Sequence, residues 1–134
     1  MNNEHALALA QHSLEHAGMA PPEDAQVRAE RFLREAADSR QVWGLSDGAG
    51  WASSGDEASP TVPLWSQHHE AEAALPNFPD FAVAALDLDT LVLDVLPALA
   101  QFGCWVGANL TPELGGLEFD PEEMRDALKD NRDG

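Results

Sequence analysis

Apolar residues recur at helical spacing in the segment that spans about Glu23–Asp38. Ala25, Ala29 and Phe32 fall on one side of this segment, while acidic and basic residues four positions apart occupy the other. Acidic residues at the start favour the positive end of a helix dipole. The segment therefore predicts a helix with one buried face and one solvated face.

A longer helical pattern begins at Asp87 or Asp89 and ends at Gly103, a residue that favours a helix C-terminus. Its main apolar side consists of Leu88, Leu91, Val92, Val95, Leu99 and Phe102, and its second side of Leu93 and Leu96. With two apolar sides, this helix is expected to be deeply buried. Pro97 predicts a kink or a restart of its last turns.

Shorter segments bounded by Gly, Pro and Asp predict strands. Residues 41–45 and 51–54 are joined by a glycine-rich turn and predict a hairpin. Residues 61–65 predict a third strand, in which Pro63 favours the edge of a sheet or the start of a strand. Residues 81–86 predict a strand or a buried link. Residues 104–110 predict a core strand, and residues 117–119 predict a short returning strand.

Two further helices have clear start signals. Ser66 is placed to cap a helix over residues 67–75, and Asp120 followed by Pro121 is placed to begin one over residues 121–130. We therefore expect an α+β fold in a single small domain, residues 21–130. Its sheet would be mostly antiparallel, with about five short strands packed by about three to four helices.

Residues 1–20 predict an N-terminal helical appendage that ends before the two prolines at positions 21 and 22. Leu7 and Leu14 form a narrow apolar stripe on it, narrower than a core helix needs. A homodimer through this helix is one hypothesis for that stripe. Residues 131–134 are expected to be a polar tail.

The charge of the chain is strongly negative, with seven Lys and Arg against 24 Asp and Glu and a formal net charge of −17. No Lys or Arg occurs between Arg40 and Arg125. Binding to nucleic acid or to an anionic membrane needs basic residues, so we expect neither and instead expect a basic protein partner. The single cysteine, Cys104, and the lack of a long apolar segment or basic leader predict a cytoplasmic location.

Two groups of histidines are candidates for divalent-metal binding. His12 and His16 lie four residues apart on the predicted first helix, and His68 and Glu72 have the same spacing on a later one. His69 and Glu70 complete the second group. The alternative is that both groups are solvated helix faces.

Three tryptophans lie on the predicted sheet, Trp43 and Trp51 beside the hairpin turn and Trp65 at the end of the third strand. They are either core residues or an exposed aromatic surface for a partner. The acidic residues nearest to that surface in the sequence are Asp47, Asp56 and Glu57. Because no complete catalytic set is present, we expect a protein that is not an enzyme and uses no cofactor.

A set of short motifs occurs in a characteristic order along the chain. The motifs are Arg31-Phe32-Leu33, Val42-Trp43-Gly44-Leu45, Gly50-Trp51-Ala52, Pro63-Leu64-Trp65-Ser66, Leu96-Pro97-Ala98-Leu99, Gly103 with Val106, and Pro121-Glu122-Glu123-Met124. Over about residues 24–129 the chain resembles the bacterial family called domain of unknown function 2750. A weaker likeness is to the N-terminal domain of the enhanced-serine-sensitivity protein. The resemblance implies a small bacterial α+β protein with no established activity and no catalytic residues to carry over.

These observations give a leading hypothesis and an alternative. The leading one is a protein-interaction module, similar in role to an immunity protein or an adaptor, that binds a basic partner through the tryptophan-bearing acidic region. The alternative is a protein that binds a small molecule or a divalent metal through His68, His69, Glu70 and Glu72 near a tryptophan-lined cleft.

Overall fold

The computed structural model describes residues 24–55 and 57–133 of the chain. The expected N-terminal helix lies outside the described residues, together with Leu7, Leu14, His12 and His16. Asp56 lies outside them as well. Among the described helices, none is both long enough and apolar enough to cross a membrane.

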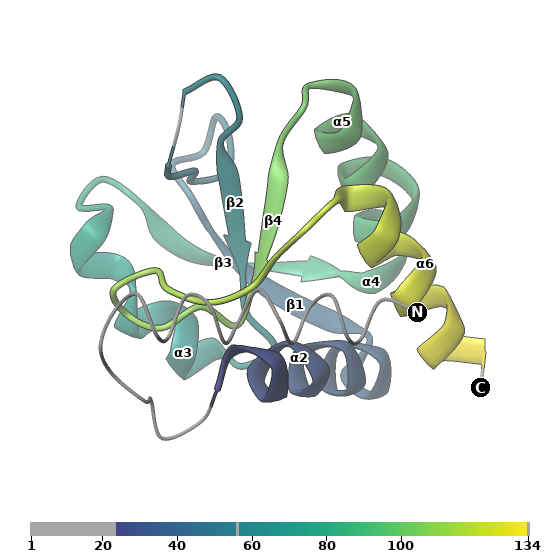
Figure 1. The fold of residues 1–134 in the computed structure, drawn as a ribbon. Helices are drawn as coiled ribbons and strands as arrows, with labels where there is room; N and C mark the ends of the chain where they lie inside the picture. The colour runs from purple at the N-terminus through teal and green to yellow at the C-terminus, as the bar shows by residue number, and fades with distance from the viewer. Residues whose placement is uncertain (1–23, 56, 134) are drawn as a thin grey trace.

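Helix α2 spans Ala25–Ser39 and lies along the lower side of the molecule in Figure 1. Asp24 precedes it in an extended conformation, and its carboxylate accepts a hydrogen bond from the N–H of Val27 at 2.9 Å. This cap sets the start of the helix. The buried residues of α2 are Ala25, Arg28, Ala29, Phe32 and Ala36.

The described residues contain five strands in two small sheets. The strands are β1 (Gln41–Ser46), β2 (Thr61–Leu64), β3 (Ala82–Asp87), β4 (Trp105–Ala108) and β5 (Glu118–Phe119). β1 and β3 form an antiparallel pair, whereas β4 lies between the parallel strand β2 and the antiparallel strand β5. An isolated antiparallel bridge between Trp43 and Trp65 joins the two sheets. The predicted α+β class is confirmed.

The predicted hairpin between residues 41–45 and 51–54 is wrong in its pairing. β1 takes β3 as its neighbour. The returning segment joins β1 only by a bridge from Ser46 to Trp51 and a bond from Ala52 N to Leu45 O at 2.8 Å, and its Ser54 bridges Thr61 of β2. The physical reason is that Trp51 turns onto β1. A Cβ built on Gly44 would lie 2.9 Å from the Trp51 ring.

The long helical segment after β3 has three parts: α4 (Leu88–Thr90), the π-helical turn η2 (Leu91–Val95) and α5 (Leu96–Gln101). Asp87 caps its start by accepting the N–H of Thr90 at 2.8 Å. Pro97 follows the π turn, as expected where a proline cannot join an α-helical bond ladder. The predicted stripe is buried or half-buried from Leu88 to Leu99, and its last member, Phe102, follows the end of α5. Leu93 is 69% exposed and Phe102 is 75% exposed, and the expectation of deep burial is wrong for both.

The remaining helices are α3 (His68–Ala73), the 3₁₀ turn η1 (Leu75–Asn77) and α6 (Pro121–Asp133). Asp120 begins α6 as predicted, because its carboxylate accepts the N–H of Glu122 at 2.8 Å. The predicted cap of α3 is wrong: Gln67 precedes the helix and makes no side-chain cap bond. Ser66 instead points into a buried polar cluster.

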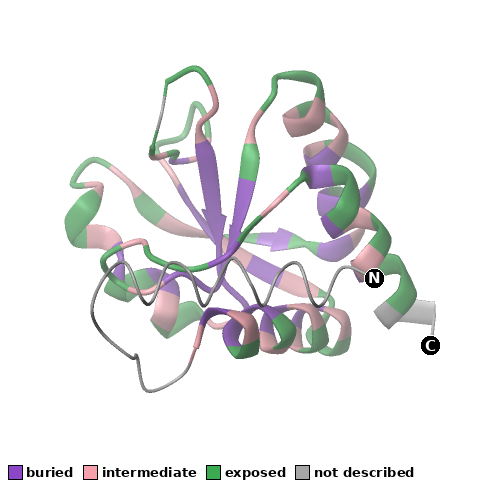
Figure 2. Ribbon diagram, viewed as in Figure 1, coloured by how far each residue is buried: buried purple, intermediate pink, exposed green. Residues whose placement is uncertain are grey.

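Apolar side chains gather in two cores, one on each face of the β1–β3 pair. The larger core joins α2, β2, β4, η2, α5 and α6 around Phe32, Leu64 and Val106. The smaller core lies around Trp65 and Leu45, next to α3. β2 is buried along its whole length, as Figure 2 shows, so the carboxyl ends of β2 and β4 are held rigidly against α2.

Candidate functional site

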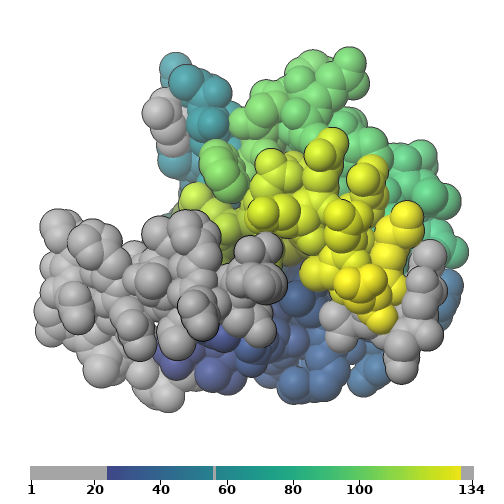
Figure 3. Space-filling model, turned by 45° about the vertical axis from the view of Figure 1, so that its right-hand side comes forward, coloured from purple at the N-terminus to yellow at the C-terminus, as the bar shows by residue number. Residues whose placement is uncertain are grey.

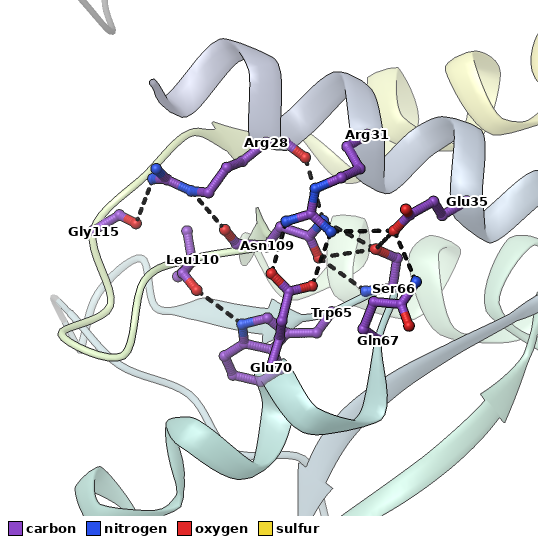
Figure 4. Close-up of polar contacts among 10 residues, drawn as sticks. All are labelled: Arg28, Arg31, Glu35, Trp65, Ser66, Gln67, Glu70, Asn109, Leu110 and Gly115. Carbon is purple, nitrogen blue, oxygen red and sulfur yellow. Dashed lines mark hydrogen bonds and ion pairs between the residues drawn. The ribbon is translucent and has the colours of Figure 1, made fainter. Parts of the chain in front are cut away.

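Asn109 is the centre of a buried polar cluster at the carboxyl ends of β2 and β4 (Figure 4). Its Oδ1 accepts the backbone N–H of Ser66 at 2.8 Å, and its Nδ2 donates to the Ser66 Oγ at 3.0 Å and to the Arg28 carbonyl at 3.3 Å. The residue has a φ of 50°, in the left-handed region that Asn tolerates better than most residues. Asn109 therefore joins α2, β2 and β4 through one side chain.

The Arg28 guanidinium is buried and points to backbone carbonyls. Its Nε donates to the Asn109 carbonyl at 3.0 Å and its Nη2 donates to the Gly115 carbonyl at 3.2 Å. Close by, the Trp65 indole donates to the Leu110 carbonyl at 2.9 Å. These bonds hold the loop that follows β4 against α2, because buried polar groups need partners.

A half-buried rim of charged residues lies beside this cluster. Arg31 forms a two-pronged ion pair with Glu70 at 3.0 and 2.7 Å and a further contact with Glu35 at 3.1 Å. Glu35 also accepts the Ser66 hydroxyl at 2.7 Å and the Gln67 amide at 3.2 Å. Partial burial raises the pKa of Glu35, but the bonds from Ser66 and Gln67 and the charge of Arg31 outweigh it, so the pKa lies below its ordinary value.

Ser66 and Glu35 resemble the nucleophile and base of a hydrolase in residue type only. Ser66 is 5% exposed, and its hydroxyl already donates to Glu35 and accepts from Asn109. A reacting group would need free access to that oxygen. The chemistry of the cluster is therefore structural: it fixes α2 and α3 to the ends of two parallel strands.

The predicted histidine group on α3 does not converge on one point. His68 lies against the Trp43 ring, with ring centroids 4.8 Å apart, and its Nδ1 is 3.5 Å from a Glu72 oxygen. His69 is exposed, and Glu70 is turned toward Arg31. Within residues 24–55 and 57–133, no group of three or more His, Cys, Asp or Glu side chains is arranged to hold a metal.

The predicted tryptophan surface is wrong in one member. Trp65 is fully buried at 0% exposure, because its indole fills the smaller core and bonds to Leu110. Trp43 and Trp51 are half-buried. Asp47 is exposed, but its carboxylate accepts the N–H groups of Ala49 and Gly50, which closes the turn and lowers its pKa. Trp65 therefore belongs to the core and Asp47 to the turn, and these residues do not form a continuous exposed surface.

The exposed aromatic residues are instead Phe102 and Trp105, which the sequence patterns assigned to the core. Phe102 is 75% exposed and Trp105 is 40% exposed. Gly103, with a φ of 72°, ends α5 between them and turns the chain into β4. Gly103 is the sequence feature that indicates this exposure, because it ends the helix and leaves Phe102 and Trp105 outside the helical segment.

The register of β4 and β5 brings two carboxylates to the side of the sheet that carries Trp105. β5 is antiparallel to β4, so Asp120, just after its end, lies at the same end of the sheet as Trp105. Glu118 pairs with Gly107 and accepts the Thr61 hydroxyl at 2.8 Å, which places it on the Trp105 face of the sheet. We call Phe102, Trp105, Glu118 and Asp120, with Glu57 of the neighbouring loop, the Phe102–Trp105 surface.

The loop that holds Glu57 is attached to the base of this surface. Ser59 Oγ donates to the Gly103 carbonyl at 3.3 Å, and Trp105 N donates to the Pro60 carbonyl at 2.8 Å. Above these contacts the loop and the end of α5 form separate projections with a hollow between them, as Figure 3 shows. The surface therefore combines exposed aromatic rings, acidic groups and a concave shape.

Comparison with known proteins gives one match. The family model described as "Protein of unknown function (DUF2750)" matches residues 29–128, which is most of the chain. No curated protein and no solved structure matches the chain significantly. The matched range covers the Phe102–Trp105 surface, the smaller core, and the larger core and the buried polar cluster except for Ala25 and Arg28, which precede it. The chain therefore belongs to the DUF2750 family of proteins of unknown function.

Proposed function

We propose that this protein is an interaction module that binds a basic segment of a partner protein on the Phe102–Trp105 surface. The observation that carries the proposal is the exposure of both aromatic side chains in a part of the sequence that has no Lys or Arg from residue 41 to residue 124. Large exposed aromatic residues are costly to keep in water and are common at binding sites.

The chemistry of the surface favours Arg and Lys side chains. A cation over the face of a tryptophan gains about 0.5–2 kcal/mol, depending on how far it is desolvated. Carboxylates around the ring attract the same cation and speed its encounter at low salt. Glu57, Glu118 and Asp120 supply these groups; Glu118 also accepts the Thr61 hydroxyl, and Asp120 also accepts the N–H of Glu122. A role like that of an immunity protein or an adaptor, in the cytoplasm, is consistent with this chemistry and stays part of the proposal.

The arrangement of the described residues does not favour the alternative, a small-molecule or divalent-metal site on α3. Its Glu70 is engaged with Arg31, and His68 and His69 lie at the surface without a third ligand among the described residues. The proposal contains no catalytic step, because the Ser66 hydroxyl is buried and already bonded to Glu35 and Asn109.

A binding titration with a defined basic peptide tests the proposal. The probe is a fluorescent octa-arginine peptide, and the variant is the double substitution Phe102→Ala and Trp105→Ala. We expect this variant to bind about tenfold more weakly, which is the size of one lost cation–π contact with its apolar area. Leu93→Ala is the matched control, because Leu93 is also a large exposed apolar residue, at 69%, but belongs to η2.

The comparison of the two variants decides the outcome. Weaker binding by the double variant and unchanged binding by Leu93→Ala supports the proposal. Equal binding by all three proteins would mean that the peptide responds only to net charge, and that result contradicts a specific role for the aromatic pair.

A further inference from the structure

β3 is an edge strand whose outer backbone groups have no partner within the described residues. It pairs with β1 on one side and with no strand on the other. An unpaired strand edge presents a row of N–H and C=O groups that can pair with another strand. The register of β3 with β1 determines which residues carry these groups.

The pairing of β1 shows which residues of β3 point outward. Trp43 exchanges two backbone hydrogen bonds with Trp65 at 2.7 and 2.8 Å, and the Leu45 carbonyl accepts the N–H of Ala52. The backbone N–H and C=O groups of Trp43 and Leu45 therefore face away from β3. In an antiparallel pair, opposite residues both point inward or both point outward. The residues opposite Trp43 and Leu45 are Ala85 and Val83. Their N–H and C=O groups, and those of Asp87 by the same alternation, therefore face outward.

The centre of this edge lacks the usual protections against pairing, and Asp87 at its end is the one charged residue of β3. Ala85 and Asp87 are exposed, and residues 81–86 contain no charge, proline or glycine. By contrast, the outer edge of β2 carries Pro63, and β5 is only two residues long. Figure 1 shows β3 crossing the molecule behind β2 and β4, away from the loops of the Phe102–Trp105 surface.

We propose that two copies of the chain pair through β3 in antiparallel orientation, so that the strands β1-β3-β3-β1 form one continuous sheet. The occupant is a second copy because the edge fits itself. With a twofold axis at Ala85, the outward residue Val83 of one copy lies opposite Asp87 of the other. Every second residue of β3 points outward, so an outward residue of one copy can only lie opposite an outward residue of the other. Asp80 therefore cannot lie opposite Asp87. The uncharged centres of the two strands meet without repulsion.

The proposal is independent of the binding of a basic partner, because the two respond to salt in opposite ways. Both copies carry a net charge of −17, so added salt screens their repulsion and should strengthen self-association. Binding of an arginine peptide should weaken in the same series. Failure of one proposal therefore leaves the other standing.

Analytical ultracentrifugation of the full chain at low and high salt tests the pairing. We expect a dimer that becomes more populated as salt rises. The variant Ala85→Pro removes an outward N–H, which no bond within the described chain uses, and should be a monomer. The matched control Ala85→Val keeps this N–H and favours a strand, so it should dimerise at least as well as the wild-type chain.

Hydrogen exchange keeps the test decisive if Ala85→Pro folds poorly. In the wild-type chain, the amides of Val83, Ala85 and Asp87 should be protected at high protein concentration and exchange quickly after dilution. The inward amides of Ala84 and Leu86 should stay protected at both concentrations. A monomer under all conditions would overturn the proposal, and so would a dimer that Ala85→Pro leaves intact and that Leu7→Glu with Leu14→Glu abolishes.

Discussion

The Arg28 guanidinium donates its Nε–H to the backbone carbonyl of Asn109 at 3.0 Å, across 81 residues of sequence. Asn109 returns a bond from its side-chain amide to the Arg28 carbonyl at 3.3 Å. This reciprocal pair fastens the first described helix to the end of β4. The position of α2 relative to the parallel strands depends on it.

Replacing Asn109 by Ala should destabilise the protein by about 2–4 kcal/mol. The change leaves the buried Ser66 N–H without its Asn109 partner, removes the bond to the Arg28 carbonyl, and places Ala at a φ of 50° without the local bonding of Asn. Urea denaturation measures the change. Asn109→Gly serves as the control, because it relieves the backbone strain and loses only the side-chain bonds. A midpoint for Asn109→Ala equal to that of the wild-type chain would show that the cluster does not stabilise the fold.

Replacing Gly44 by Ala should destabilise the protein by about 1–3 kcal/mol, because an added methyl group overpacks the site. The new Cβ would lie 2.9 Å from the Trp51 ring and 3.1 Å from a Leu64 methyl group. Thermal unfolding and tryptophan fluorescence should both change, since the ring must move. Gly50→Ala is the matched control, because no atom lies within 4 Å of its Cβ. Equal melting of both variants would contradict the packing of Trp51 onto β1.

Stability should fall as the pH drops through the acid range. The pKa values of Glu35, Asp47 and Asp87 all lie below their ordinary values, the first of 4.5 and the others of 3.8. Hydrogen bonds from Ser66 and Gln67 overcome desolvation at Glu35, N–H groups of the turn act at Asp47, and Thr90 acts at Asp87.

The direction of this change in stability with pH follows from proton binding. A lowered pKa means that the unfolded chain takes up protons first, so the stability from these groups is fully present above the ordinary pKa values and is lost below them. Glu35→Gln should weaken the pH dependence of urea denaturation near pH 4.5, and the exposed-loop variant Glu57→Gln should retain it. A steeper acid loss in Glu35→Gln would contradict the sign.

Replacing Glu70 by Gln should lower stability by about 1 kcal/mol and loosen α3. The carboxylate makes a two-pronged ion pair with Arg31, whose side chain is 19% exposed, so screening by water is incomplete. Glu72→Gln is the control on the same helix, because Glu72 is 56% exposed and contacts only His68 among the ion pairs described. If the two variants melt together, the Arg31 contact does not hold α3.

Local signals in the sequence predicted several boundaries correctly. Asp24 and Asp120 cap their helices and Gly103 ends α5, since each of these effects depends on residues within one turn. The α+β class followed from the same signals. Pro63 lies on an edge strand, where a missing N–H is tolerated.

Long-range pairings were beyond local signals. Ser66 has the sequence of a helix cap, yet it bonds Asn109, 43 residues later, because β2 and β4 end side by side. β1 pairs with β3 across a loop longer than the predicted hairpin turn. Phe102 follows the last residue of α5, so a helical period extended through it does not describe its exposure.

Chemical-shift mapping of an arginine peptide on the full-length protein tests the central claim most directly. The account predicts that the largest amide shifts fall on residues 57–61, 102–106 and 118–120, which form the Phe102–Trp105 surface, and that Trp105→Ala removes them. Shifts centred on His68–Glu72 and Trp43, or spread evenly over the acidic residues, would contradict it.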